Sequence, residues 1–334
     1  SATTPNATVT TAVDASAQSV SSTVEETADG DIIIGYEYSY DSLGRISSET
    51  LLAENIRYDY AYDSLSRVIS RTAVNLETNE SATENYTYDQ AGNITSSVKG
   101  DTSEQFAYDE NNRLVSFGNT AITYDADGNM ISGLGMTLSF DSSNRLASAG
   151  GNTYTYDVEN IRVKNLCGDS ETEYTYDTTA ELSRLLYKVE NDSTVTKYIY
   201  GIGLIGEVSE SGAKIYHFDY RGSTAAITDK DGEITDTFSY DTYGKLENRT
   251  GTSAIIFLYN GRDGVVTDSN GLLYMRARYY SPVLKRFANA DIIAGVITDP
   301  VTLNRYAYAN GNPVSNIDPF ELTAEKSGTH ISNA

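Results

Sequence analysis

The sequence predicts an all-β protein in which a repeated hairpin builds a long antiparallel sheet. A short unit recurs eight times between residues 38 and 177: a large apolar or aromatic residue, a small residue, an aromatic residue and aspartate. A period near 20 residues is typical of repeat architectures. The 334-residue chain also contains 27 tyrosines and no tryptophan. Tyrosine favours half-buried pleated surfaces, so this bias indicates many strands.

Each unit has the pattern of one β-hairpin. Its two large side chains are two residues apart, so they share one face of a strand, while the small residue between them faces the other way. Aspartate then begins a turn, because its carboxylate accepts backbone N–H bonds and a nearby glycine or asparagine tolerates positive φ. The units are Tyr38-Ser39-Tyr40-Asp41, Tyr60-Ala61-Tyr62-Asp63, Tyr86-Thr87-Tyr88-Asp89, Phe106-Ala107-Tyr108-Asp109, Ile122-Thr123-Tyr124-Asp125, Leu138-Ser139-Phe140-Asp141, Tyr154-Thr155-Tyr156-Asp157 and Tyr174-Thr175-Tyr176-Asp177. We expect these residues to hold turns and core together, without a catalytic role.

The chain divides into four parts by composition. Residues 1–30 have no aromatic side chain, and two alternatives fit them: a flexible linker, or an extended strand that pairs with an open sheet edge. We predict a repeat sheet over residues 31–250, a closing domain over residues 251–322 with a hairpin at Asp268–Gly271, and a polar C-terminal stub over residues 323–334.

Charge and composition argue against several functional classes. The formal net charge of −23 repels nucleic-acid phosphates and anionic lipid, so we expect no nucleic-acid binding. The sequence contains no run of 18 apolar residues, so we expect no membrane span. With Cys167 as the one cysteine and two histidines far apart, His217 and His330, we predict no disulfide, no metal site and no cofactor. His217 has two interpretations, a general base or a strand residue. The strand residue is favoured because no nucleophile motif accompanies it.

The last third of the chain carries an ordered set of motifs. Arg278-Tyr279-Tyr280 is followed by Arg286-Phe287, by Asp291, and finally by Asp318-Pro319-Phe320-Glu321-Leu322. This stretch resembles the core domain that closes Rhs and YD-repeat proteins, with its pattern RYYxPxxGRF, an acidic residue, and LNxYxYxxNNPxxxxDPxGL. The aromatic-aspartate units resemble the YD repeats themselves. The resemblance implies a curled or spiralling β-shell closed by an Rhs core domain. It also implies a secreted or cell-surface protein that carries a C-terminal toxin or cargo segment as its partner.

The resemblance also implies a site where the chain cuts itself. In that family two carboxylates and an arginine act as in an aspartic protease, and the chain is cut after the final leucine. Paired carboxylates suit this chemistry, because one keeps a proton while the other accepts one from water. Carried over to this sequence, the catalytic residues are Arg278, Asp291 and Asp318, and the cut falls between Leu322 and Thr323. Asp299 competes for the role of the first acid, but we prefer Asp291 for its distance from Arg278.

One departure from the family pattern leaves the activity open. Glu321 stands where glycine is expected, and it adds bulk and a third negative charge. The site is therefore either active or degenerate, and any enzyme activity would be an aspartyl autoproteolysis confined to its own chain. The alternative is a structural surface, filament-forming or adhesive protein without catalysis, which self-associates through sheet edges or the N-terminal segment. This alternative rests on the number of hairpins, which is small for enclosing a folded toxin. Sugar binding by exposed tyrosines is a third option.

Overall fold

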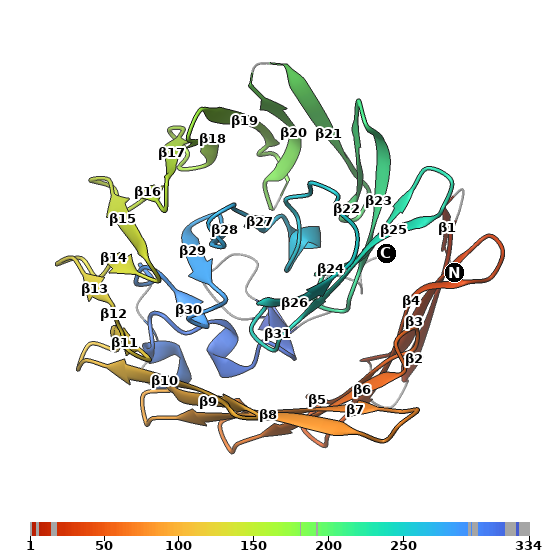
Figure 1. Cartoon of the computed structure of the whole chain (residues 1–334), viewed down its shortest axis with the longest axis horizontal. Helices are drawn as coiled ribbons and strands as arrows, with labels where there is room; N and C mark the ends of the chain where they lie inside the picture. Colours follow the sequence, from red (N-terminus) through yellow and green to blue (C-terminus); the bar gives the residue numbers. More distant parts are fainter. Residues whose placement is uncertain are drawn as a thin grey trace.

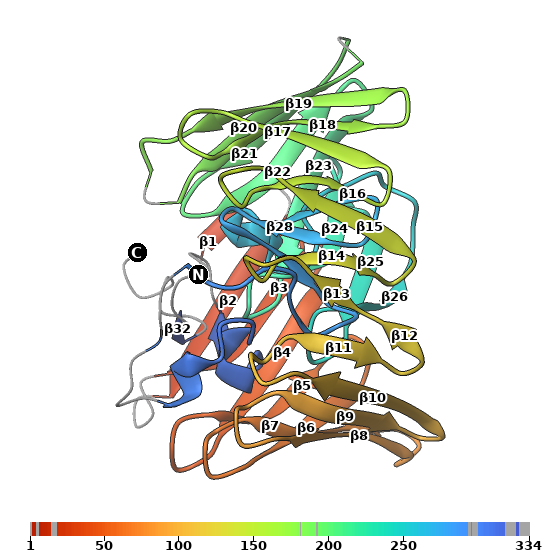
Figure 2. The same cartoon turned by 90° about the vertical axis from the view of Figure 1, so that its left-hand side faces the viewer.

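A computed structural model describes residues 2–4, 7–14, 19–180, 182–191, 193–292, 295, 300–317 and 325–326. These residues form antiparallel strands and short 3-10 helices, and the predicted all-β class is confirmed. In Figure 1 the strands run around a ring, and the strands of the closing part lie inside it. Figure 2 shows the same strands from the side, where the repeats follow one another in steps.

Two sheets make the ring, and within each sheet every strand pairs with the next one in sequence. The first sheet comprises β1 (Ala2–Thr4), β2 (Ala7–Asp14), β3 (Ser19–Thr27), β4 (Ile32–Tyr40), β5 (Ile46–Leu51), β6 (Ile56–Tyr62), β7 (Val68–Asn75), β8 (Ser81–Tyr88), β9 (Ile94–Lys99), β10 (Thr102–Tyr108), β11 (Leu114–Phe117) and β12 (Thr120–Ala121). The second comprises β13 (Thr123–Tyr124), β14 (Met130–Gly133), β15 (Met136–Phe140), β16 (Leu146–Ala149), β17 (Asn152–Tyr156), β18 (Arg162–Cys167), β19 (Ser170–Asp177), β20 (Arg184–Glu190), β21 (Thr194–Tyr200), β22 (Leu204–Ser209), β23 (Gly212–Phe218), β24 (Thr224–Asp229), β25 (Ile234–Tyr240) and β26 (Leu246–Arg249). The expected single sheet is thus interrupted near Ile122, whose side chain is buried.

The closing part follows β26 with short elements. These are η1 (Gly261–Asp263), β27 (Val266–Thr267), β28 (Leu273–Met275), β29 (Arg278–Ser281), β30 (Arg286–Phe287), η2 (Pro300–Leu303), η3 (Ala309–Gly311), β31 (Asn316–Ile317) and β32 (Glu325–Lys326). Strands β27 to β30 form a four-stranded sheet, and β27 and β28 are the predicted hairpin around Asp268–Gly271. The division of the chain at residues 30, 250 and 322 stays a prediction.

The turn aspartates act as the sequence predicts. In a typical repeat, Oδ1 of Asp109 accepts hydrogen bonds from the backbone N–H groups of Asn111 (3.0 Å) and Arg113 (2.9 Å). Its Oδ2 accepts from Nε of Arg113 at 2.6 Å. The side chain at this fourth position after the aspartate also reaches the next repeat, as when Nη1 of Arg67 donates to the carbonyl of Asp89 at 3.2 Å. One aspartate therefore closes its own turn and fixes the residue that joins it to its neighbour.

The hydrogen bonds of the tyrosine hydroxyls explain why the repeats contain tyrosine more often than phenylalanine. The second aromatic side chain of a unit packs against the core, and in several units its hydroxyl donates to a backbone carbonyl earlier in the sheet. Tyr62 donates to Ile46 at 2.6 Å, and Tyr88 donates to Val68 at 2.7 Å. A half-buried hydroxyl needs such a partner, and the partner here belongs to the neighbouring hairpin. Tyr62 and Tyr88 therefore each supply both apolar area and a hydrogen bond between repeats.

The N-terminal residues are strands of the first sheet. Strand β3 pairs with β2 on one side and β4 on the other, so a flexible linker is the wrong description of residues 7–14 and 19–27. These strands lie beside β23 and β24, where β4 contacts β24 and Glu25 meets His217. The beginning and the end of the repeat region thus meet, which closes the ring in Figure 1.

Candidate functional site

Arg278 lies at the start of β29, directly after a tight turn. Arg276 and Ala277 join β28 to β29, and Arg276 takes a left-handed φ of 56° to allow it. The Arg278 side chain is buried, and its guanidinium carbon lies 3.6 Å from the centroid of the Phe287 ring on β30. This cation–π contact restricts the direction in which the guanidinium points.

Asp291 lies within reach of that guanidinium. Nη2 of Arg278 is 3.0 Å from Oδ2 of Asp291. The backbone of Arg305 fixes both partners, because its carbonyl accepts from the N–H of Asp291 at 2.9 Å and from Nη1 of Arg278 at 3.3 Å. In return, Nε of Arg305 donates to the carbonyl of Asp291 at 2.6 Å. The structure thus brings together two of the residues that the sequence singled out, and adds a third.

Arg305 could not have been found from the sequence. It occupies an unspecified position in the family pattern LNxYxY, so the pattern gives it no weight. Its role depends on contacts with residues 14 and 27 positions earlier in the chain.

The remaining predicted site residues lie outside the described part of the chain. These are the second acid Asp318, the competing acid Asp299, the unusual Glu321, and the expected cut between Leu322 and Thr323. The structure therefore shows Asp291 paired with Arg278, and the catalytic acid pair stays a prediction.

A cavity of about 190 Å³ opens beside the ion pair. Its wall includes Arg278, Asp291 and Asn289 from the closing part, together with Arg145 and Asp127 from two turns of the repeat sheet. The repeat shell and the closing part both contribute, so the cavity forms only where the closing part docks into the ring. Asn289 and Arg145 were not predicted as site residues.

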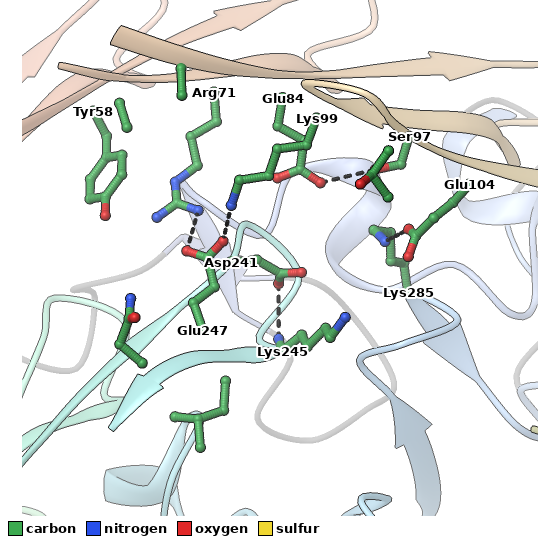
Figure 3. A pocket seen from close by; sticks show the side chains of 15 residues that line it. Tyr58, Arg71, Glu84, Ser97, Lys99, Glu104, Asp241, Lys245, Glu247 and Lys285 are labelled. Carbon is green, nitrogen blue, oxygen red and sulfur yellow. Dashed lines mark hydrogen bonds and ion pairs between the residues drawn. The ribbon is translucent and has the colours of Figure 1, made fainter. Parts of the chain in front are cut away.

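A second and larger cavity of about 590 Å³ lies between strands β6 to β10 and the hairpin of β25 and β26 (Figure 3). Its charges are largely paired. Glu247 forms ion pairs with Lys99 and with Arg71, the latter at 3.0 Å between Nη1 and Oε2. Lys285 of the closing part pairs with Glu104 at 2.6 Å. These pairs connect the inner hairpin and the closing part to the ring, so we interpret this cavity as part of the inner wall.

Asp241 borders the larger cavity and begins the turn between β25 and β26. Burial raises the pKa of its carboxyl to about 6, against a smaller lowering by Lys285. A folded-state pKa above the ordinary value means that the charged form costs stability above pH 6, and that the cost disappears as pH falls toward 4. We expect Asp241→Asn to raise the free energy of unfolding by about 1–3 kcal/mol at pH 8 and by little near pH 4. The new amide oxygen can still accept from the N–H groups of Tyr243 and Lys245.

Urea unfolding at the two pH values measures this difference. Asp109→Asn at the matching position of an outer turn is the control. There burial acts to raise the pKa, but the hydrogen bonds from Arg113 and Asn111 outweigh it and lower the pKa overall. Its charge stabilises the fold at pH 8, so this variant should lose stability. If Asp241→Asn were as destabilising at pH 8 as Asp109→Asn, our account of the buried carboxylate would be wrong.

His217 is a buried residue of β23, as favoured from the sequence. Its Nδ1 lies 2.5 Å from Oε2 of Glu25, and its Nε2 lies 2.9 Å from Oγ1 of Thr228. The imidazole therefore joins the first strands of the ring to the last ones.

Among the described residues, no three or more His, Cys, Asp or Glu side chains gather in a way that could hold a metal ion. No helix there has the length and apolar character needed to cross a membrane.

Comparison with known proteins identifies the fold family. The family model of the teneurin YD-shell matches residues 2–314. The chain belongs to the YD-shell family. The predicted kinship with Rhs and YD-repeat proteins is thereby confirmed.

Curated relatives of this YD-shell chain are much longer proteins. It is 30% identical over 256 residues to the tRNA3(Ser)-specific nuclease WapA of Bacillus spizizenii, which covers 75% of this chain and 10% of the relative. It is 27% identical over 258 residues to the double-stranded DNA deaminase toxin A of Burkholderia cenocepacia, covering 71% and 17% of the two proteins. The chain thus spans a small fraction of each relative.

Solved structures share the fold of this YD-shell chain. A Tc holotoxin pore from Photorhabdus luminescens superimposes with a TM-score of 0.78 at 18% identity, over 96% of this chain and 18% of the other. The complex TcdB2-TccC3-Cdc42 gives a TM-score of 0.72 at 18% identity, over 95% and 18% of the two chains. At this identity the likeness concerns the arrangement of strands.

Proposed function

We propose that this chain is the YD-repeat shell scaffold of a protein with a C-terminal toxin or cargo segment, and that it contains a self-cleaving aspartyl site, active or degenerate, for the bond between Leu322 and Thr323. The scaffold half of the proposal follows from the family and from the ring of hairpins around the closing part. The relatives named as a tRNA nuclease and a DNA deaminase toxin support a toxic segment as the cargo class. A secreted or cell-surface location is part of the same proposal.

The observation that carries the cutting half is the Arg278–Asp291 ion pair beside a cavity that the shell and the closing part build together. In the proposed reaction, Asp291 and Asp318 share one proton. One carboxylate accepts a proton from water, and the water oxygen bonds to the carbonyl carbon of Leu322. Arg278 stabilises the negative charge that develops on the carbonyl oxygen. The bond to the nitrogen of Thr323 then breaks and that nitrogen takes a proton, which leaves a new carboxylate and a new amine.

Glu321 determines whether the reaction runs in this sequence. Its carboxylate lies one residue from the bond to be cut and adds a negative charge next to a reaction that develops one. We expect the unchanged protein to be cut slowly or not at all, and Glu321→Gly to be cut. The intact mass of both proteins after incubation at several pH values measures this. Two fragments from Glu321→Gly support the proposal, and an uncut Glu321→Gly protein at every pH contradicts the cutting half.

A second candidate function is a structural assembly without catalysis, and one observation favours it. The outer faces of β20, β21 and β22 expose the apolar side chains of Tyr187, Val195, Ile199 and Val208 around Lys197. In the eight aromatic-aspartate units the corresponding middle residue is small, as with Thr123 and Ser139. Adjacent exposed apolar side chains of this kind often mark contacts with another protein. Filaments or particles of several copies in electron micrographs would favour this function, and a monomer at all concentrations would remove it.

A further inference from the structure

Among the described residues, the side-chain amide oxygen of Asn289 has no hydrogen-bond partner. It lies in the wall of the 190 Å³ cavity, two residues before Asp291. Only 6% of Asn289 is exposed to solvent. Its amide oxygen is fully buried and accepts no hydrogen bond. Burying an amide oxygen without a hydrogen bond is costly, and native structures keep few such groups, so this one calls for an explanation.

The backbone around Asn289 is held between the repeat shell and the closing part. Asn289 forms a β-bridge with Asn129. The backbone of the preceding Ala288 forms hydrogen bonds both to the closing part and to the repeat shell. The N–H of Ala288 donates to the carbonyl of Tyr279 at 2.8 Å, and its own carbonyl accepts from the N–H of Met130 at 2.8 Å. The backbone is therefore fixed between the shell and the closing part.

A neighbouring asparagine in the same wall shows the contrast. The side-chain amide of Asn129 donates to Asp125 at 2.9 Å and to Asn144 at 3.0 Å, so its structural role is evident. Within the described part of the chain, the amide oxygen of Asn289 has no such partner. A hydrogen-bond donor on a segment bound in the cavity would supply one.

We propose that Asn289 is a substrate-binding residue of the self-cleavage site, and that its Oδ1 accepts a hydrogen bond from a backbone N–H of the segment that is cut. This inference rests on the proposed function. Asn289 and Asp291 both line the cavity, so they can contact one bound segment together. An extended peptide supplies N–H donors at regular intervals, and a neutral amide accepts them without adding a second negative charge beside Asp291.

A role of Asn289 in substrate binding and a role in the fold predict different stabilities for a truncated variant. Truncating a residue that only supports the fold lowers the stability of the protein. A buried amide without a hydrogen bond instead destabilises the protein as long as no substrate is bound, so its removal should not lower the stability. In the Glu321→Gly protein, we therefore expect Asn289→Ala to slow the cut by about 10- to 100-fold. The melting temperature of that variant should equal or exceed that of its Glu321→Gly parent.

The experiment follows the intact mass over time and the melting temperature for Glu321→Gly alone, with Asn289→Ala, and with Asn165→Ala. Asn165 is the matched control, because its amide oxygen is also buried without a partner but lies on β18, outside the wall of this cavity. Asn165→Ala should cut at the parent rate.

The outcomes distinguish the two proposals. If Glu321→Gly stays intact, the cutting half of the proposed function fails and the role of Asn289 falls with it. If the parent cuts and Asn289→Ala cuts equally fast, only the role of Asn289 is overturned. A slower cut accompanied by a lower melting temperature would also overturn it, because Asn289 would then act through the fold.

Discussion

Arg162→Met is expected to lower the free energy of unfolding by about 3–5 kcal/mol, the range for breaking a buried ion pair. Arg162 is fully buried, and its Nη1 lies 2.6 Å from Oδ2 of Asp268 in the closing part. Its guanidinium carbon is 4.3 Å from the ring centroid of Tyr274 and 5.2 Å from that of Tyr154, so aromatic faces from both the shell and the closing part surround the charge. Without Arg162, the carboxylate of Asp268 is left in that apolar surrounding.

Urea unfolding of the purified variant measures the loss. Arg57→Met is the matched control, since Arg57 pairs with Asp59 at 2.9 Å on the exposed surface, where both side chains are about two-fifths accessible. This control should cost less than about 1 kcal/mol. The double variant Arg162→Met/Asp268→Leu should recover a large part of the loss, because it leaves no unpaired charge. Equal losses for Arg162→Met and Arg57→Met would contradict the view that this pair holds the closing part in the ring.

Asp291→Asn in the Glu321→Gly protein is expected to slow self-cleavage by at least about 100-fold, since it removes a group that must take or give a proton. The ion pair with Arg278 is replaced by a weaker hydrogen bond, but the backbone contacts with Arg305 remain. The fold should therefore be kept. The rate comes from the fraction of uncut protein in a time course of intact mass.

Two further variants sharpen this prediction. Asp127 lines the same cavity, but we assign it no part in the chemistry, so Asp127→Asn should cut at the parent rate. Asp299→Asn tests the competing assignment of the first acid. A protein that stops cutting with Asp299→Asn and continues with Asp291→Asn would show that the choice of Asp291 was wrong.

The repeats could be predicted because their causes are local. The alternation of Tyr60, Ala61 and Tyr62 determines which side chains face inward, and the aspartate that follows begins the turn within four residues. The class of the fold and the position of most hairpins therefore follow from short stretches of sequence.

The closure of the ring and the full wall of the site could not be predicted in this way. Glu25 and His217 are 192 residues apart, and no local pattern indicates that β3 will lie beside β23. Residues 7–14 and 19–27 lack aromatic side chains, so their place in the sheet depends on pairing with β4. The role proposed for Asn289 depends on its buried amide oxygen without a hydrogen bond, which no local sequence pattern indicates.

Arg162 is different, because the sequence contained a signal for it. The fifth residue after the aspartate is apolar in the neighbouring repeats, as with Leu114 and Leu146, and these side chains are buried. Arg162 takes that position after Asp157. A charge at a buried position of a repeat indicates a partner from elsewhere in the fold, here Asp268.

The most direct test of this account is the N-terminal residue of the smaller fragment released by the Glu321→Gly protein. The account predicts a single fragment that begins at Thr323 and is absent when Asp291→Asn is added. A fragment that begins elsewhere, such as at Pro300 or Pro319, or one that forms equally well with Asp291→Asn, would contradict the proposed site.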